Sequence, residues 1–212
     1  MTESTPPPLA QFADRLRHGA AESLTDETVS QLYAHYRLLL RWNERTSLVG
    51  PGTLCRAVEL HYAEALAALP HIPRSSAGTL VDVGSGAGFP GFVLAAARPR
   101  LRVVLVESRA RKWAFLRAAV LESGISVDCV HGRVDRSLPA PFPPRVDWLT
   151  LRALKLPRRA WTALTARLAE NGRVLVWAGR EDPEIPDGIL RKKSTTPLPG
   201  TEWRRIVELE RS

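Results

Sequence analysis

The stretch from Leu80 to Gly91 limits the possible folds of this chain more than any other part of it. An apolar segment, Leu80 to Val83, runs directly into a glycine-rich turn. Pro90 follows, a residue favoured in the first turn of a helix because it has no N–H to leave unpaired. Strand, glycine turn and helix in this order are typical of the entry to a nucleotide-binding βαβ unit.

An acidic residue stands where such a unit needs one. Residues 102–107 have the pattern of the next strand, and that strand ends at Glu107. Glu107 lies about 20 residues beyond the glycine turn, the spacing expected of a carboxylate that accepts hydrogen bonds from ribose hydroxyls. The two features together predict a cofactor that contains a nucleoside.

The glycines fit two cofactor patterns. Gly84-x-Gly86-x-Gly88 follows the strand directly, with Asp82 two residues before it. That arrangement suits S-adenosylmethionine (SAM), which has no phosphate to bind and whose cationic methionine end favours a nearby carboxylate. Gly86-x-Gly88-x-x-Gly91 is also a dinucleotide fingerprint, so an NAD-dependent oxidoreductase stays an alternative. The proline before Gly91 has no N–H to offer a pyrophosphate, which favours SAM.

Strands and helices alternate from Thr79 onward. We expect strands near 79–83, 102–107, 126–130, 146–151 and 173–177, helices at 90–97, 109–123 and 157–171, and a terminal strand pair at 189–195 and 203–209. Asn171-Gly172 is expected to end the last of these helices. Such alternation predicts an α/β fold, in which helices cover both faces of a parallel sheet.

The first third of the chain has a different character. Residues 1–8 are predicted to form a disordered tail, residues 9–78 a helical cap and a linker, and residues 79–212 the cofactor-binding domain. Thr53 is expected to cap a helix that runs to about Leu69.

Composition narrows the class of protein. No apolar run reaches the roughly 18 residues needed to cross a bilayer, and the N-terminus lacks the core of a signal peptide, so we expect a cytoplasmic protein with no membrane partner. Cys55 and Cys129 are expected to be buried free thiols in a reducing compartment. The histidines form no zinc-binding pair, and we expect no metal site.

The net charge of +8 is unevenly distributed. Residues 1–78 hold 7 basic and 8 acidic residues, whereas residues 79–212 hold 23 basic and 14 acidic ones. A polyanion approaching the cofactor would account for this excess. The basic residues are almost all arginines, so a biased genome composition would account for it equally well.

Several segments closely resemble the bacterial 16S ribosomal RNA guanine-N7 methyltransferases, the RsmG or GidB family. In chain order the matching segments are Trp42-Asn43, His61-x-x-Glu64-x-Leu66, Asp82 to Gly91, Leu105 to Ser108, Lys112-x-x-Phe115-Leu116, Gly132 to Asp135 and Leu151 to Ala153. The resemblance spans roughly residues 30–180. It implies a Rossmann-like class I SAM-dependent methyltransferase fold, with a mostly parallel seven-stranded sheet, helices on both faces and an N-terminal helical cap.

The resemblance also implies an activity and a partner. The activity is methyl transfer from SAM to N7 of a guanine, and the partner is 16S ribosomal RNA or the small ribosomal subunit; we expect a monomer. The residues expected to contact SAM are Gly84, Gly86, Gly88, Phe89, Glu107, Val134, Asp135 and Arg152. The N–H of Val134 and the side chain of Asp135 are expected beside the adenine, and Arg152 at either the methionine carboxylate or the RNA.

The chemistry of guanine N7 fits a site in which we assign no catalytic residue. The N7 lone pair lies in the ring plane and bears no proton at neutral pH, so alignment of the reactants suffices and no base is needed. We predict RNA contacts for two clusters beside the crevice, which are Arg109, Arg111 and Lys112, and Lys155, Arg158 and Arg159. Trp113 and Trp161 are candidates for base stacking, although core packing is the favoured interpretation for both.

Three positions depart from the family pattern. Ser47 and Glu64 stand where the family typically has Asn and Asp, and Ala178 replaces a lysine after the fifth strand. The cofactor half matches better than the segments expected to face substrate. A relative with another substrate, or an inactive SAM- or RNA-binding protein, therefore remains an alternative.

Overall fold

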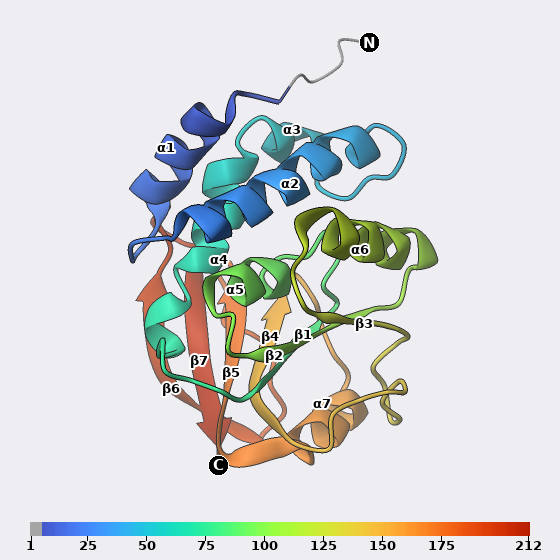
Figure 1. Cartoon of the computed structure of the whole chain (residues 1–212). Helices are drawn as coiled ribbons and strands as arrows, with labels where there is room; N and C mark the ends of the chain where they lie inside the picture. The colour runs from blue at the N-terminus through green and yellow to red at the C-terminus, as the bar shows by residue number, and fades with distance from the viewer. Residues whose placement is uncertain (1–5) are drawn as a thin grey trace.

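The computed structural model describes residues 6–212, and a seven-stranded sheet runs through it (Figure 1). The strands are β1 (Thr79–Val83), β2 (Arg102–Glu107), β3 (Asp128–His131), β4 (Val146–Arg152), β5 (Leu168–Ala178), β6 (Leu190–Pro197) and β7 (Arg205–Arg211). Their order is β3-β2-β1-β4-β5-β7-β6. The first five are parallel, and β7 pairs antiparallel with both β5 and β6. The predicted mostly parallel α/β sheet and its terminal strand pair are confirmed.

Helices cover both faces of this sheet, as predicted, but unequally. The helical segments are α1 (Leu9–Gly19), α2 (Asp26–Asn43), α3 (Pro51–Leu54), a π-helix (Val58–Ala63), α4 (Glu64–Leu66), a 3₁₀ turn (Leu69–His71), α5 (Gly91–Ala97), α6 (Ala110–Ser123) and α7 (Arg158–Thr165). One buried cluster joins α1, α2, α5 and α6 to one face of the sheet. The other face is covered by α7 and by loop side chains such as Phe142 and Ile185.

Local sequence explains why the two helices after β1 and β2 form where they do. Pro90 is the residue just before α5, so this helix begins one residue later than expected. The helix α6 ends at Gly124, whose φ of +70° is a left-handed conformation that glycine adopts without cost. Helix α2 is capped by the Thr25 side chain, which accepts a hydrogen bond from the N–H of Thr28 (3.1 Å).

Two helix predictions are wrong. The helix predicted at 157–171 ends at Thr165, and Asn171-Gly172 lies inside β5 instead of ending a helix. The buried Leu168 begins a strand beside Val146, and the ladder then shifts register before Arg173. A bulged strand of this kind has no regular apolar period, so the pattern of alternation did not show where the helix gives way to the strand.

The single helix predicted from Thr53 to about Leu69 is broken into short pieces. Thr53 lies within α3 and caps nothing, and the Val58–Ala63 segment is a π-helix. The wider turn of a π-helix shifts the face presented by the residues after it, which a helical period of 3.6 cannot anticipate. Cys55 is exposed and Cys129 half-buried, so the expectation of two buried thiols is wrong, although neither forms a disulfide.

Part of the predicted tail, residues 1–5, lies outside the described residues. Pro7, within the same predicted segment, accepts a hydrogen bond at its carbonyl from the Tyr33 hydroxyl (2.8 Å). Between residues 6 and 212, no helix is both long and apolar enough to cross a membrane.

Candidate cofactor pocket

A cavity of about 740 Å³ lies at the carboxyl ends of β1 to β4. Its walls come from the segments that follow these four strands and from the loop and π-helix between α2 and α4. Of the residues predicted to contact SAM, Gly84, Gly86, Phe89, Glu107, Val134, Asp135 and Arg152 line it. Gly88 does not. Parallel strands bring their carboxyl ends to one edge, which is why residues far apart in sequence meet here.

The glycine turn is held against β2 by Glu107. One carboxylate oxygen of Glu107 accepts from the N–H of Gly86 and the other from the N–H of Arg109, both at 2.8 Å. The N–H of Gly84 also donates to the Val106 carbonyl (2.8 Å). A carboxylate oxygen accepts more than one hydrogen bond, so Glu107 keeps capacity for a ligand.

Gly86 leaves the space above it open. Its φ is +56°, and a Cβ built there would have only the Gly84 carbonyl oxygen (3.8 Å) and the Lys112 Nζ (4.0 Å) within 4 Å. The backbone of a ligand-binding turn is thus bare at this point. Any side chain at Gly86 would occupy the pocket rather than the protein core.

The other two glycines of the dinucleotide pattern serve packing. A Cβ on Gly88 would lie 2.9 Å from the Phe92 Cβ and 3.2 Å from the His35 Nε2. A Cβ on Gly91 would lie 2.5 Å from the Asp82 Cβ. Both glycines face other helices or β1, and neither lines the cavity. Of the three glycines in the dinucleotide pattern, only Gly86 therefore lines the pocket.

Asp82 does not lie where it was expected. It was predicted near the cationic end of SAM, but it is 1% exposed and does not line the cavity. Its carboxylate accepts from the Thr150 hydroxyl (2.7 Å) and from the N–H of Gly91 (3.2 Å). Burial raises the pKa of Asp82 to about 6. The Asp82 side chain therefore lies beneath α5, where its hydrogen bonds link β1 to β4 and to the start of α5.

Arg152 is held from one side only. Its Nη2 donates to the Leu60 carbonyl (2.8 Å) and to the His61 Nδ1 (3.1 Å), and lies 3.1 Å from a Glu64 carboxylate oxygen. Its Nη1 is buried and has no hydrogen-bond partner within residues 6–212. A buried, unpaired donor on a charged group is costly, which indicates that this nitrogen awaits a partner.

His61 was missed as a site residue. Its ring stacks on Phe89, with 5.1 Å between the ring centroids, and it lines the cavity. Burial, with the charges of Arg152 and Arg204, lowers the pKa of His61 to about 3. The ring is therefore neutral, accepts from Arg152 at Nδ1, and donates from Nε2 to the Thr53 hydroxyl (3.1 Å). Its place in the matching segment ending at Leu66 was the available indication.

The departures from the family pattern are partly explained. Glu64 is buried between Arg152 and the Arg204 Nη1, which lies 2.5 Å away. Ala178, at the end of β5, pairs with Arg205, at the start of β7. Arg204 directly precedes Arg205, so a cation is still present at this edge of the sheet. Ser47 is exposed, in a loop that the Asn43 side chain shapes by accepting from the N–H groups of Leu48 and Val49 (2.9 Å each).

The six cations predicted to bind RNA differ in how available they are. Arg159 pairs with Asp135 and Lys155 with Glu184, while Arg158 donates to the Asp187 carbonyl (3.3 Å). Arg109 and Lys112 line the cavity, and burial lowers the pKa of Lys112. Arg111 is exposed and forms no ion pair in the part of the chain that the structure describes.

The tryptophans predicted as core residues are mostly so. Trp161 is 3% exposed and packs under the sheet. Trp113 is half-buried, donates to the Cys129 carbonyl (3.1 Å) and stacks on His131. Across residues 6–212, no three His, Cys, Asp or Glu side chains gather as metal ligands.

Comparisons with known proteins agree on a family. Residues 28–186 match the GidB family model, described as rRNA small subunit methyltransferase G. A protein of that name from Rhodopseudomonas palustris is 36% identical, over 98% of this chain and 90% of its own length. Another, from Methylobacillus flagellatus, is 40% identical over 86% of this chain and 88% of its own.

Solved structures show the same fold at low sequence identity. The mitomycin 7-O-methyltransferase MmcR superposes with a TM-score of 0.61 at 18% identity, over 97% of this chain and 69% of its own. A SAM-dependent methyltransferase from Aquifex aeolicus has a TM-score of 0.58 at 16% identity, over 77% of this chain and 94% of its own. The sheet is thus that of the class I SAM-dependent methyltransferases, and the chain belongs to the GidB family, rRNA small subunit methyltransferase G.

Proposed function

We propose that this protein transfers a methyl group from SAM to N7 of a guanine in the 16S RNA of the small ribosomal subunit. Membership of the GidB family supports methylation of small-subunit ribosomal RNA. The observation that carries the proposal is the cavity at the carboxyl ends of β1 to β4, where a bare glycine turn faces a carboxylate and a buried arginine.

The residues present fit SAM on three counts. Gly86 leaves an open surface that a Cβ would fill, Glu107 retains acceptor capacity at the end of β2, and Arg152 has a buried donor without a partner within the described chain. SAM, when bound, supplies a sulfonium-activated methyl group. We assign Glu107 to its ribose hydroxyls, and Val134 and Asp135 to the adenine.

Arg152 is the residue we assign to the methionine carboxylate. The sequence left open whether it meets this carboxylate or the RNA. Its side chain is only 17% exposed, and the π-helix and Glu64 hold it inside the protein. A phosphate of a bulky RNA reaches such a nitrogen poorly, whereas a carboxylate on a small ligand can reach it and accept a charge-assisted hydrogen bond from Nη1. Phe89, stacked on His61, walls the same pocket.

The site suits an acceptor that needs no deprotonation. The one histidine in the wall, His61, is held neutral and committed to Arg152 and Thr53. Lys112 and Arg109 are donors and cannot take a proton in their charged forms. Guanine N7 carries no proton, so these residues need only to bind, orient and exclude water while the reactants align.

We further propose that the six cations of the two clusters meet RNA phosphates around the mouth of the cavity: Arg109, Arg111, Lys112, Lys155, Arg158 and Arg159. All six are exposed or line it, which supports the assignment. We retain residues 9–78 as a helical cap and linker on a SAM-binding unit of residues 79–212, and a cytoplasmic monomer as the form that acts.

The proposal is tested by binding and by transfer. Isothermal titration of the wild-type protein should give saturable binding of SAM and none of NADH, and Glu107→Gln should weaken SAM binding. Labelled SAM should then label the RNA of small subunits that lack the modification. Binding of NADH in place of SAM would overturn the cofactor assignment, and SAM binding without labelling would overturn the substrate.

A further inference from the structure

Trp203 is the one tryptophan within residues 6–212 that is largely open to solvent. It is 47% exposed, whereas the other five are buried or half-buried. It lies in the turn between β6 and β7, and the guanidinium carbons of Arg180 and Arg204 lie over its ring, at 5.8 and 5.4 Å from the centroid. A single exposed tryptophan is ordinary on a protein surface, so the feature that distinguishes Trp203 is the pair of arginines over its ring.

The turn that carries Trp203 lies at the same edge of the sheet as the cofactor pocket. Ala178 at the end of β5 pairs with Arg205 at the start of β7, which places Arg180 and Trp203 beside each other. Figure 1 shows the β6–β7 turn at the edge where β4 and β5 end. The edge is therefore continuous from the pocket to this turn.

A second hollow, of about 630 Å³, lies beside Trp203 and next to the segment that forms part of the wall of the first cavity. It is lined by Arg56, Leu60 and residues 200–204. Leu60 directly precedes His61, which lines the cofactor pocket. Arg204 also reaches the pocket through Glu64, which pairs with both Arg204 and Arg152.

The charge of this surface fits a polyanion. Arg56 and Arg180 are exposed, and neither forms an ion pair among the described residues. Glu202 is the single acidic residue in the wall of the second hollow. An exposed aromatic ring among arginines is the arrangement with which proteins hold single-stranded nucleic acid, because bases stack on the ring and phosphates pair with the cations.

We propose that Trp203, with Arg56, Arg180 and Arg204, forms a stacking platform for an unpaired nucleotide that neighbours the methylated guanine. The base takes the place of the Arg180 guanidinium over the Trp203 ring, and the adjoining phosphates meet Arg56 and the displaced Arg180. This inference rests on the proposed function, since it names where the RNA of that reaction is held. A base-paired helix would not use the platform, because its bases are already stacked within the helix.

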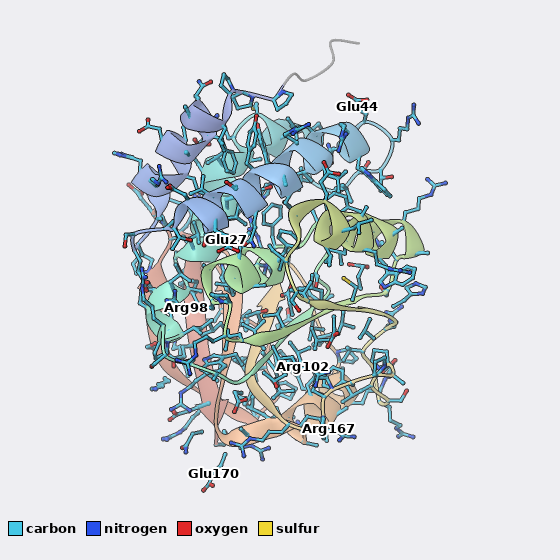
Figure 2. The ribbon with its side chains drawn as sticks, viewed as in Figure 1. Glu27, Glu44, Arg98, Arg102, Arg167 and Glu170 are labelled. Atoms are coloured by element: carbon cyan, nitrogen blue, oxygen red, sulfur yellow. The ribbon has the colours of Figure 1, made fainter. Side chains whose placement is uncertain are left out.

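The test compares Trp203→Ala with Trp203→Phe, which keeps an aromatic face, and with Arg180→Ala. Arg167→Ala is the matched control, since Figure 2 places Arg167 at the opposite end of the sheet, near α7. Two readouts are needed: the KM for small subunits in methyl transfer, and the Kd for a short single-stranded RNA that carries 2-aminopurine, whose fluorescence is quenched by stacking. SAM affinity and the melting temperature are measured alongside.

We expect Trp203→Ala to raise both the KM and the Kd at least about fivefold and to abolish the quenching, the loss typical of one stacked base. Trp203→Phe should retain most of the binding. Arg180→Ala should weaken RNA binding and reduce its salt dependence, and Arg167→Ala should resemble the wild type. In all these variants kcat, SAM affinity and the melting temperature should equal those of the wild type.

Each other outcome overturns the platform or separates it from the proposed function. Unchanged KM and Kd in Trp203→Ala, with transfer intact, would refute the platform and leave the proposed function standing. A raised KM without a raised Kd for single-stranded RNA would assign the surface to a ribosomal protein instead. Losses that accompany a lower melting temperature would reduce Trp203 to a structural role. Quenching that depends on Trp203, in a protein that transfers no methyl group, would keep the platform and reject the proposed reaction.

Discussion

Gly86→Ala isolates the role of the bare glycine turn. Gly86 and Gly124 both have positive φ, +56° and +70°, and a Cβ at either would meet no atom closer than 3.8 Å. Alanine at either position should therefore cost only the left-handed backbone, about 1–2 kcal/mol. In a chain of 212 residues that amounts to a melting temperature lower by about 2–8 °C. The two variants should be equally destabilised.

Their affinity for SAM should differ. Gly86 lines the cofactor pocket, whereas Gly124 ends α6 and does not. A methyl group in a well-fitted site costs about 1–3 kcal/mol, so Gly86→Ala should raise the Kd for SAM by about 5- to 150-fold. Gly124→Ala should leave it unchanged. Titration calorimetry measures both, and equal SAM affinity in the two variants would refute the placement of the cofactor over this turn.

Three further predictions concern buried and surface charge. Burial raises the pKa of Asp82 from 3.8 to about 6. As the pH rises from about 4 to about 6, the unfolding free energy of the wild type should therefore fall by about 3 kcal/mol relative to that of Asp82→Asn. Parallel pH profiles of the two proteins in chemical denaturation would contradict this. Glu64→Gln leaves Arg152 and Arg204 buried without their counter-ion, so it should lower the unfolding free energy by about 3–5 kcal/mol. A loss below about 1 kcal/mol in chemical denaturation would show that water already solvates these two arginines. Arg111→Glu should weaken RNA binding and flatten its dependence on salt, with SAM affinity unchanged, and an unaltered salt slope would remove Arg111 from the RNA surface.

The part of the site that the sequence predicted is local. The turn from Gly84 to Phe89 is set by the strand before it and the helix after it, and Glu107 follows at a spacing fixed by one helix, one turn and one strand. These features depend on neighbouring residues, so their pattern survives in the sequence. The sequence did not predict the orientation of Asp82, because Asp82 fills space that the absence of a side chain on Gly91 leaves open.

The rest of the site depends on contacts between distant segments. Arg204 and Glu64 meet only because β7 pairs with β5 and the π-helix turns Glu64 inward. His61 contacts Arg152, which lies 91 residues further along the sequence. No helical or strand periodicity encodes such a meeting. The same holds for Trp203, whose exposure is a property of the folded edge and not of its neighbours in the chain.

The proposed reaction can be measured as methyl transfer to isolated small subunits. Labelled SAM is incubated with subunits that lack N7-methylguanosine in their 16S RNA, and the RNA is then digested to nucleosides and separated. We expect a single labelled product, N7-methylguanosine, formed by the wild type and much more slowly by Gly86→Ala at limiting SAM. A label on any other nucleoside, or none from a protein that binds SAM, would contradict it.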